Sequence, residues 1–249
     1  MRHFISVSDF SKDEIHKVLK KAISLKESLK KGSIDTATQE KMKGKSVGMI
    51  FSKPSNRTRV SFEVGLNQFG VFPIYLKSDE VGIGVRETVG DVAKVMSRYV
   101  QGVVIRNDSF EELVEFSESS DVPVINALTD LNHPCQAMAD AMTLLEIFES
   151  FEAFKMTYVG DGNNVCYSLI KLAQIVGLDL TVCCPKGFEP KLKDGYRLDH
   201  DIESATKDVD VVYTDVWTSM GQESEQEKRL NAFKGYQENT GIMESGRKK

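Results

Sequence analysis

The stretch FSKPSNRTRVSFEVG (residues 51–65) places two arginines beside short polar side chains, where a buried strand is predicted to run into a helix. The N–H groups of a first helical turn have no partner inside the helix, and the helix dipole favours negative charge there. Hydroxyls add donors, and a guanidinium matches the oxygens of a phosphate. We therefore expect an anion site, although an ordinary helix cap beside solvated arginines would give the same pattern. The residues of this candidate site are Ser55, Asn56, Arg57 and Thr58.

A second group of polar side chains follows two later strands. Arg106 ends an apolar strand, where it could bind a ligand or simply be solvated. His133 and Gln136 stand at the next strand-to-helix junction and would suit a neutral amide or carbonyl, because a neutral imidazole can donate to a developing oxyanion. The histidine could equally be a helix cap. We do not expect Cys135 to be a nucleophile, since no second histidine is placed to activate it.

Two further clusters lie in the second half of the chain. GDGNN (residues 160–164) follows a strand and opens a helix, but Val165 replaces the third glycine of a dinucleotide site and no ribose-binding acid follows the next strand. We therefore reject a nicotinamide cofactor. In TDVWTSMGQE (residues 214–223), Asp215 ends a strand and precedes a turn. A capping turn would explain it, but an aspartate there could also take the ammonium group of an amino acid.

These clusters offer three kinds of recognition. Guanidiniums would bind a phosphate, histidine and glutamine a carbonyl, and asparagine and aspartate a zwitterion. A phosphate-bearing acyl donor and an amino-acid acceptor would fit them together.

The elements that must position these side chains alternate between strand and helix patterns along the whole chain. Such alternation predicts an α/β fold of parallel sheets covered by helices on both faces, with ligands beyond the carboxyl ends of the strands. Every cluster above falls at such an end. Ser109 and Glu112 predict a capping box for one of the helices. We place a domain boundary inside the helix at residues 134–150, which divides the chain into domains 1–145 and 146–249.

Composition excludes several classes of function. With 249 residues the chain can bury a sizeable core, and its net charge of −5 gives no indication of general binding to nucleic acid. No apolar run approaches the length of a membrane span, and the first residues lack the apolar core of a secretory signal. The 4 cysteines show no metal-binding spacing and indicate reduced thiols of a cytoplasmic protein.

Four motifs, in order along the chain, resemble those of the ornithine carbamoyltransferases in the aspartate/ornithine carbamoyltransferase family. SNRTR is similar to the family's Ser-Thr-Arg-Thr-Arg, with Asn56 in place of the first threonine. HPCQ, GDGNN and DVWTSMGQE resemble its other signatures, and the SMG triplet indicates ornithine rather than aspartate as acceptor. The resemblance runs from the N-terminal helix to about Tyr236.

The resemblance implies transfer of a carbamoyl group from carbamoyl phosphate to L-ornithine, giving citrulline in arginine biosynthesis, by a two-lobed cytoplasmic homotrimer. It implies no metal and no organic cofactor. The implied catalytic residues are Arg57, Arg106, His133 and Gln136. The implied carbamoyl-phosphate site contains Ser55, Asn56, Arg57, Thr58, Arg106, His133, Pro134, Cys135 and Gln136. The implied ornithine site contains Asn164, Asp215, Ser219 and Met220.

Two departures from the family pattern shape our expectations. The stretch Lys191–Lys207 is shorter than usual, so we expect a strand–helix unit to be trimmed from a shortened second lobe. The 249 residues contain neither the family's His-Cys-Leu-Pro segment nor its final helix, so we expect weak turnover. The alternatives are a non-catalytic member that binds carbamoyl phosphate, and a carbamoyltransferase for another amine such as putrescine.

Overall fold

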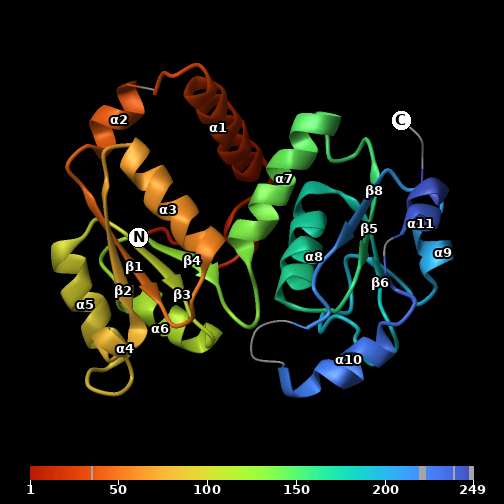
Figure 1. The fold of residues 1–249 in the computed structure, drawn as a ribbon. Helices are drawn as coiled ribbons and strands as arrows, with labels where there is room; N and C mark the ends of the chain where they lie inside the picture. Colours follow the sequence, from red (N-terminus) through yellow and green to blue (C-terminus); the bar gives the residue numbers. More distant parts are fainter. Residues whose placement is uncertain (35, 219–222, 238, 247–249) are drawn as a thin grey trace. The chain divides into compact units, whose positions relative to one another are not determined.

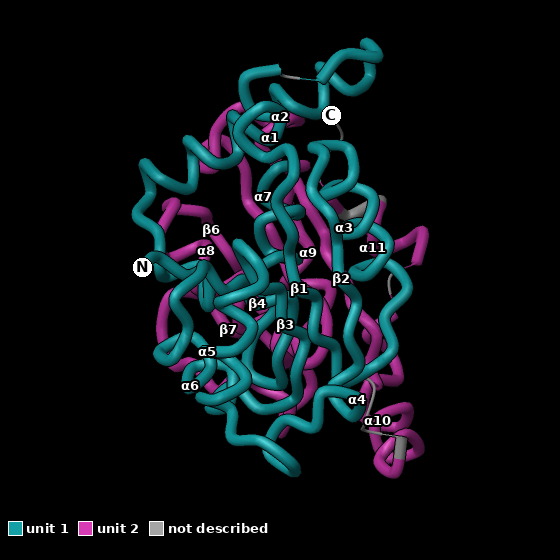
Figure 2. The backbone as a smooth tube through the Cα atoms, turned by 90° about the vertical axis from the view of Figure 1, so that its left-hand side faces the viewer, with its two compact units in different colours: residues 1–142 teal, residues 143–249 magenta. Residues whose placement is uncertain are grey.

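The computed structural model describes residues 1–34, 36–218, 223–237 and 239–246 (Figure 1). The chain separates into two compact units, residues 1–142 and 143–249, which Figure 2 colours teal and magenta. The separation falls within helix α7 (Pro134–Phe148). The domain limits expected from the sequence, 1–145 and 146–249, stay a prediction. Each unit carries its own parallel sheet flanked by helices, so the predicted fold class is confirmed.

The sheet of the first unit has the strand order β2-β1-β3-β4, and all its pairings are parallel. Because β2 follows β1 to one side and β3 follows to the other, the strand order reverses between β1 and β3. In open parallel sheets ligands bind outside the carboxyl ends of the strands at such a reversal. The strands are β1 (Ser46–Phe51), β2 (Phe72–Lys77), β3 (Val103–Arg106) and β4 (Val124–Leu128).

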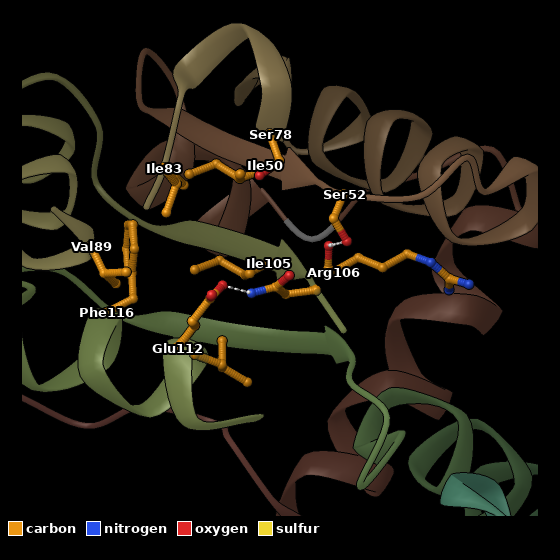
Figure 3. Close-up of a pocket in the computed structure, with 11 residues that line it drawn as sticks. Ile50, Ser52, Ser78, Ile83, Val89, Ile105, Arg106, Glu112 and Phe116 are labelled. Atoms are coloured by element: carbon orange, nitrogen blue, oxygen red, sulfur yellow. Dashed lines mark hydrogen bonds between the residues drawn. The ribbon is translucent and has the colours of Figure 1, made fainter. Parts of the chain in front are cut away.

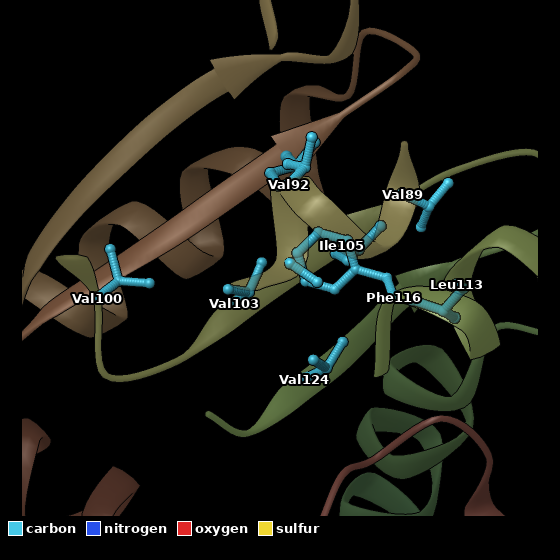
Figure 4. Close-up of a cluster of buried hydrophobic side chains, with 10 residues drawn as sticks. Val89, Val92, Val100, Val103, Ile105, Leu113, Phe116 and Val124 are labelled. Carbon is cyan, nitrogen blue, oxygen red and sulfur yellow. The ribbon is translucent and has the colours of Figure 1, made fainter. Parts of the chain in front are cut away.

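Alternate residues of these strands face two separate apolar layers, as the two-residue period of a strand requires. Ile50 and Ile105 face helices α5 and α6, where they pack against Val89 and Phe116 (Figure 4). Met49 and Val104 belong to the other layer, which includes side chains of α3. The helices of this unit are η1 (Val7–Asp9), α1 (Lys12–Lys30), α2 (Thr36–Met42), α3 (Asn56–Gln68), α4 (Ser78–Val81), α5 (Val89–Tyr99) and α6 (Phe110–Ser119).

One expectation for the first unit is only half correct. Ser109 caps α6, because its side chain accepts a hydrogen bond from the Glu112 backbone N–H at 3.1 Å. The Glu112 carboxylate does not complete a capping box but accepts a hydrogen bond from Asn107 Nδ2 at 2.7 Å. A competing amide donor five residues earlier in the chain therefore takes the carboxylate.

The sheet of the second unit has the order β7-β6-β5-β8, again with parallel pairings, and its strand order reverses between β5 and β8. The strands are β5 (Lys155–Val159), β6 (Asp179–Cys183), β7 (Arg197–Asp199) and β8 (Val211–Thr214). The helices are α8 (Asn164–Val176), α9 (Ile202–Thr206), η2 (Glu223–Glu225), α10 (Gln226–Ala232) and α11 (Thr240–Ser245).

The strand–helix unit that we expected to be trimmed from the second unit is present in short form. Its strand β7 has 3 residues and its helix α9 has 5. The Asp201 side chain caps α9 by accepting a hydrogen bond from Ser204 N at 3.0 Å. The shorter stretch at Lys191–Lys207 therefore reduces the elements without deleting them.

Candidate active site

The anion motif and Arg106 meet at the point where the first sheet reverses its strand order. β1 leads into α3, and β3 ends at Arg106, which pairs with Phe51 in the parallel register. Ser52 joins the carboxyl ends of β1 and β3, since its N–H and hydroxyl donate to the Arg106 carbonyl at 2.9 and 3.2 Å. Thr58 and Arg106, which are 48 residues apart in the sequence, thus belong to one edge of one sheet.

The start of α3 has no side-chain cap. Ser55 occupies the cap position in an extended conformation, with φ −151° and ψ 112°, yet its side chain accepts no hydrogen bond from the helix. Ser109 and Thr88, at equivalent positions in the same unit, both accept one. The alternative of an ordinary side-chain cap is therefore wrong, and the first N–H groups of α3 are available for an anion.

Arg106 is a buried cation that no carboxylate in the described part of the chain pairs with. Only 6% of its surface is exposed, and burial lowers its pKa from the usual arginine value. Its Nη1 donates to Thr58 Oγ1 at 3.4 Å, and its Nε has no hydrogen-bond partner among the described residues. Asp108, the nearby acid, pairs with Lys53 at 2.7 Å. Because a buried charge without a partner costs several kcal/mol, Arg106 favours an anionic ligand.

The two arginines of the motif differ in their surroundings. Arg57 is exposed, and its side chain forms no ion pair or hydrogen bond within the described ranges. Arg59 is fastened to the fold, because it pairs with Glu63 at 2.8 Å and lies 3.6 Å above the ring of Tyr75. Arg57 can therefore turn toward a ligand at little cost, whereas Arg59 holds α3 against β2.

The HPCQ segment begins α7 with three differently restrained side chains. Burial and the charge on Arg106 lower the pKa of His133 to about 4, so its imidazole is neutral at pH 7 and can donate without being charged. Cys135 donates to the Asn126 carbonyl at 3.2 Å, and burial raises its pKa to about 12, which favours the thiol over the thiolate. Gln136 Nε2 donates to Asp140 Oδ1 at 2.9 Å, so Oε1 is the atom that can accept from a ligand N–H.

A small cavity lies on the other face of the first sheet, the face that α5 and α6 cover and that is opposite α3 (Figure 3). Its volume is about 20 Å³, which suits a water molecule rather than a substrate. The Arg106 side chain points away from the other residues that line it (Figure 3). The candidate anion-binding residues therefore lie on the α3 face of the sheet and do not line the interior of this cavity. Its lining includes Ile50, Ser78, Ile83, Val89, Ile105 and Phe116.

The second unit places Asp215 and Asn163 side by side where its sheet reverses. β5 and β8 pair in parallel up to Val159 and Thr214, so the residues that follow them are neighbours. Asn163 Nδ2 donates to Asp215 Oδ2 at 2.9 Å, and Val216 N donates to Asp215 Oδ1 at 2.8 Å. Within the described ranges no cation pairs with Asp215. The expectation of a mere capping turn therefore leaves this negative charge unexplained.

The GDGNN segment serves packing and capping. A Cβ atom at Gly162 would lie 2.3 Å from Pro190 N, so only glycine fits there. Asn163 is the side chain that caps α8, and Asn164 is the first residue of that helix. Ser219 and Met220, predicted for the ornithine site, lie outside the described residues.

Sequence reasoning missed a buried ion pair beside this site. Asp161 and Arg229 are 8% and 7% exposed, and Arg229 Nη1 lies 2.6 Å from Asp161 Oδ2. Arg229 Nη1 also donates to the Trp217 carbonyl at 3.2 Å, which ties α10 to the chain segment after Asp215. No local pattern could reveal the pair, because its members are separated by 68 residues.

Comparison with known proteins decides the family. Residues 2–146 match the model described as "Aspartate/ornithine carbamoyltransferase, carbamoyl-P binding domain", and residues 152–249 match "Aspartate/ornithine carbamoyltransferase, Asp/Orn binding domain". The chain belongs to the aspartate/ornithine carbamoyltransferase family. The resemblance seen in its four motifs is thereby confirmed.

Individual members of this carbamoyltransferase family are similar over nearly the whole chain. The ornithine carbamoyltransferase of Methanosarcina acetivorans is 43% identical over 97% of this chain and 82% of the relative. That of Methanobrevibacter smithii is 44% identical over 98% and 82%. The solved structure of the ornithine carbamoyltransferase from Pyrococcus furiosus has a TM-score of 0.92 at 38% identity and covers 99% of this chain and 82% of that one.

Two kinds of feature are absent from the described residues of this carbamoyltransferase. Among them, no cluster of three or more His, Cys, Asp or Glu side chains could hold a metal ion. No helix there is both long enough and apolar enough to cross a bilayer.

Proposed function

We propose that this chain transfers the carbamoyl group of carbamoyl phosphate to the side-chain amine of L-ornithine, giving citrulline and phosphate. Membership of the family and relatives named ornithine carbamoyltransferase support the reaction. The single observation that carries it is the buried guanidinium of Arg106, which lacks an acidic partner in the described chain and lies beside the uncapped start of α3.

In the proposed complex the first unit holds carbamoyl phosphate. The N–H groups that begin α3, together with the side chains of Ser55, Asn56, Arg57 and Thr58, bind the phosphate. Arg106, neutral His133 and Gln136 hold the carbamoyl end, with Gln136 Oε1 accepting from the carbamoyl NH₂ because Nε2 is engaged with Asp140. Pro134 and Cys135 belong to the same segment and fix its backbone, since both are packed into the start of α7.

The second unit holds the amino acid in this proposal. The carboxylate of Asp215, which no cation pairs with in the described chain, receives the α-ammonium of ornithine, and Asn164 at the start of α8 takes part in holding its head group. Ser219 and Met220 are assigned to the same site on the strength of the SMG motif.

The chemistry follows from these contacts. The deprotonated side-chain amine attacks the carbonyl carbon and forms a C–N bond, and the tetrahedral oxyanion that develops lies against Arg106 and His133, which donate to it. The C–O bond to phosphate then breaks, the leaving phosphate takes up the proton lost by the attacking nitrogen, and it stays against Arg57 and α3. Positioning and fixed donors supply the rate acceleration.

Three finer properties belong to the proposal. We infer that the protein acts in arginine biosynthesis, is cytoplasmic and forms a homotrimer. The family resemblance supports all three, and the presence of its 4 cysteines as thiols suits a reducing compartment. Sedimentation equilibrium of the purified chain tests the trimer, since a monomer mass would contradict it.

Citrulline formation by the purified chain tests the function. With carbamoyl phosphate present, we expect saturable citrulline production from L-ornithine and none of the corresponding product from putrescine, which lacks the α-amino acid head that Asp215 would bind. Preference for putrescine would favour the other-amine alternative. Tight binding of carbamoyl phosphate by calorimetry without any turnover would favour the non-catalytic alternative.

A further inference from the structure

The side chain of Asn163 forms hydrogen bonds in two directions at the end of β5. Its Oδ1 accepts from the backbone N–H groups of Val165 and Cys166, each at 3.0 Å, and so caps α8. Its Nδ2 donates to Asp215 Oδ2 at 2.9 Å, across to the chain that follows β8. One amide thus joins the start of a helix to the carboxylate of the proposed amino-acid site.

The helix start fixes which way this amide faces. Two N–H donors converge on Oδ1, so turning the amide over would set its NH₂ group against both of them. The same turn would bring Oδ1 against the Asp215 carboxylate, where two acceptors repel. The cap therefore directs Nδ2 toward Asp215. The start of α8 thereby fixes the orientation of the Asp215 carboxylate.

The Asp215 carboxylate is held in one orientation but can still accept hydrogen bonds from a ligand. Nδ2 of Asn163 holds Oδ2, and the N–H of Val216 holds Oδ1 at 2.8 Å. An ionised carboxylate can accept about four hydrogen bonds, so about two remain for a ligand. No cation pairs with it in the described part of the chain, which leaves its charge for an ammonium group. A carboxylate fixed in advance avoids the cost of being ordered on binding.

We propose that Asn163 is a positioning residue for amino-acid recognition: it orients Asp215 to receive the α-ammonium of the acceptor without touching the acceptor itself. This inference rests on the proposed function. It assigns the two neighbouring asparagines different tasks: Asn164 contacts the amino acid, whereas Asn163 contacts Asp215 and holds it in place.

Two substitutions separate positioning from capping. Asn163→Ser retains a good helix cap but removes the amide donor to Asp215. Asn163→Asp also retains the cap, but it sets a second carboxylate against Asp215. At low pH the introduced carboxyl group would be protonated and would donate to Asp215 as the amide does, so it would restore the contact.

The experiment is calorimetry with L-norvaline at saturating carbamoyl phosphate, because L-norvaline keeps the amino-acid head of ornithine but lacks the side-chain amine that would react. We expect about tenfold weaker norvaline binding by Asn163→Ser, with carbamoyl-phosphate affinity and melting temperature unchanged, since one lost hydrogen bond to a charged group is of that size. For Asn163→Asp we expect a larger loss at pH 8 that shrinks as the pH is lowered toward 5.5.

The outcomes separate this inference from the function on which it rests. Wild-type affinity for norvaline in Asn163→Ser, together with a pH-independent loss in Asn163→Asp, would overturn the positioning role alone. A wild-type chain that binds carbamoyl phosphate but neither norvaline nor ornithine would overturn the proposed acceptor, and this inference with it.

Discussion

The two units begin a helix at the same topological place, and they treat it in opposite ways. α3 and α8 each follow the strand beside which the sheet reverses its order. At α3 the cap position holds Ser55, whose side chain makes no cap, and buried Arg106 supplies a positive charge. At α8, Asn163 satisfies the first N–H groups, and Asp215 supplies a negative charge. We therefore expect one sheet edge to bind an anion and the other to bind a cation.

This difference shows that topology locates a site while local contacts decide its charge. A helix N-terminus attracts anions only if its N–H groups are not already satisfied. The side chain of Asn163 removes that attraction from α8, and no equivalent bond does so at α3. Single substitutions at the two helix starts test this contrast.

Replacing Arg106 should break the anion-binding edge most severely. Arg106→Met should lose about 3–5 kcal/mol of carbamoyl-phosphate binding, the range for removing one member of a buried charge pair. Because the guanidinium lacks an acidic partner in the described chain, the melting temperature of the ligand-free variant should not fall. Calorimetry and thermal unfolding measure both. Lys53→Met, which removes an exposed ion pair, is the matched control. A large loss of stability in Arg106→Met would mean that Arg106 is structural.

Replacing Asp215 should abolish the cation-binding edge and spare the other one. Asp215→Ala should cost about 3 kcal/mol in kcat/KM for ornithine, because the α-ammonium loses its anionic partner. Carbamoyl-phosphate affinity should stay unchanged. Steady-state kinetics and calorimetry give the two quantities, and Asp210→Ala, an acid in the same unit that accepts a hydrogen bond from Lys155 N, serves as control. Equal losses for both ligands would assign Asp215 to the fold.

The two arginines of the motif should separate binding from stability. Arg57→Ala should weaken carbamoyl-phosphate binding by about 2 kcal/mol with little change in melting temperature, since Arg57 is exposed before the ligand arrives. Arg59→Ala should do the reverse, because it loses its ion pair with Glu63 and its place over Tyr75. Unchanged carbamoyl-phosphate affinity in Arg57→Ala would contradict the phosphate site.

Acid should destabilise the chain through His133. Its pKa is about 4 in the folded chain, against the usual 6.5 that we assign to the unfolded chain. The unfolded state therefore binds the proton more readily, so this contribution is complete above pH 6.5 and is lost as the pH falls toward 4. Between pH 7 and 5 the loss should be slightly under about 2 kcal/mol. Urea unfolding should show this loss of unfolding free energy in the wild type and a smaller loss in His133→Asn. Parallel pH profiles would refute a buried, neutral imidazole.

The sequence was sufficient to predict the fold class, most strands of the two sheets and the sheet edges where candidate site residues gather. Strand runs such as Ser46–Phe51 carry continuous apolar residues, and the polar side chains that follow them stand out against that background. β7 and α9 escaped prediction because 3 and 5 residues are too few for a periodic pattern. The contact of Arg59 with Tyr75 and the ion pair of Arg229 with Asp161 could not be predicted either, because tertiary packing brings these residues together from distant parts of the sequence.

The most direct test of the contrast follows backbone amide signals of the ¹⁵N-labelled chain by NMR during titration with carbamoyl phosphate. Our account predicts that the largest shifts occur at Asn56, Arg57 and Thr58, where N–H groups await the phosphate. It predicts no comparable shift at Val165 and Cys166, whose N–H groups already bond to Asn163. Saturable shifts at the start of α8, with none at the start of α3, would contradict the assignment of the anion site.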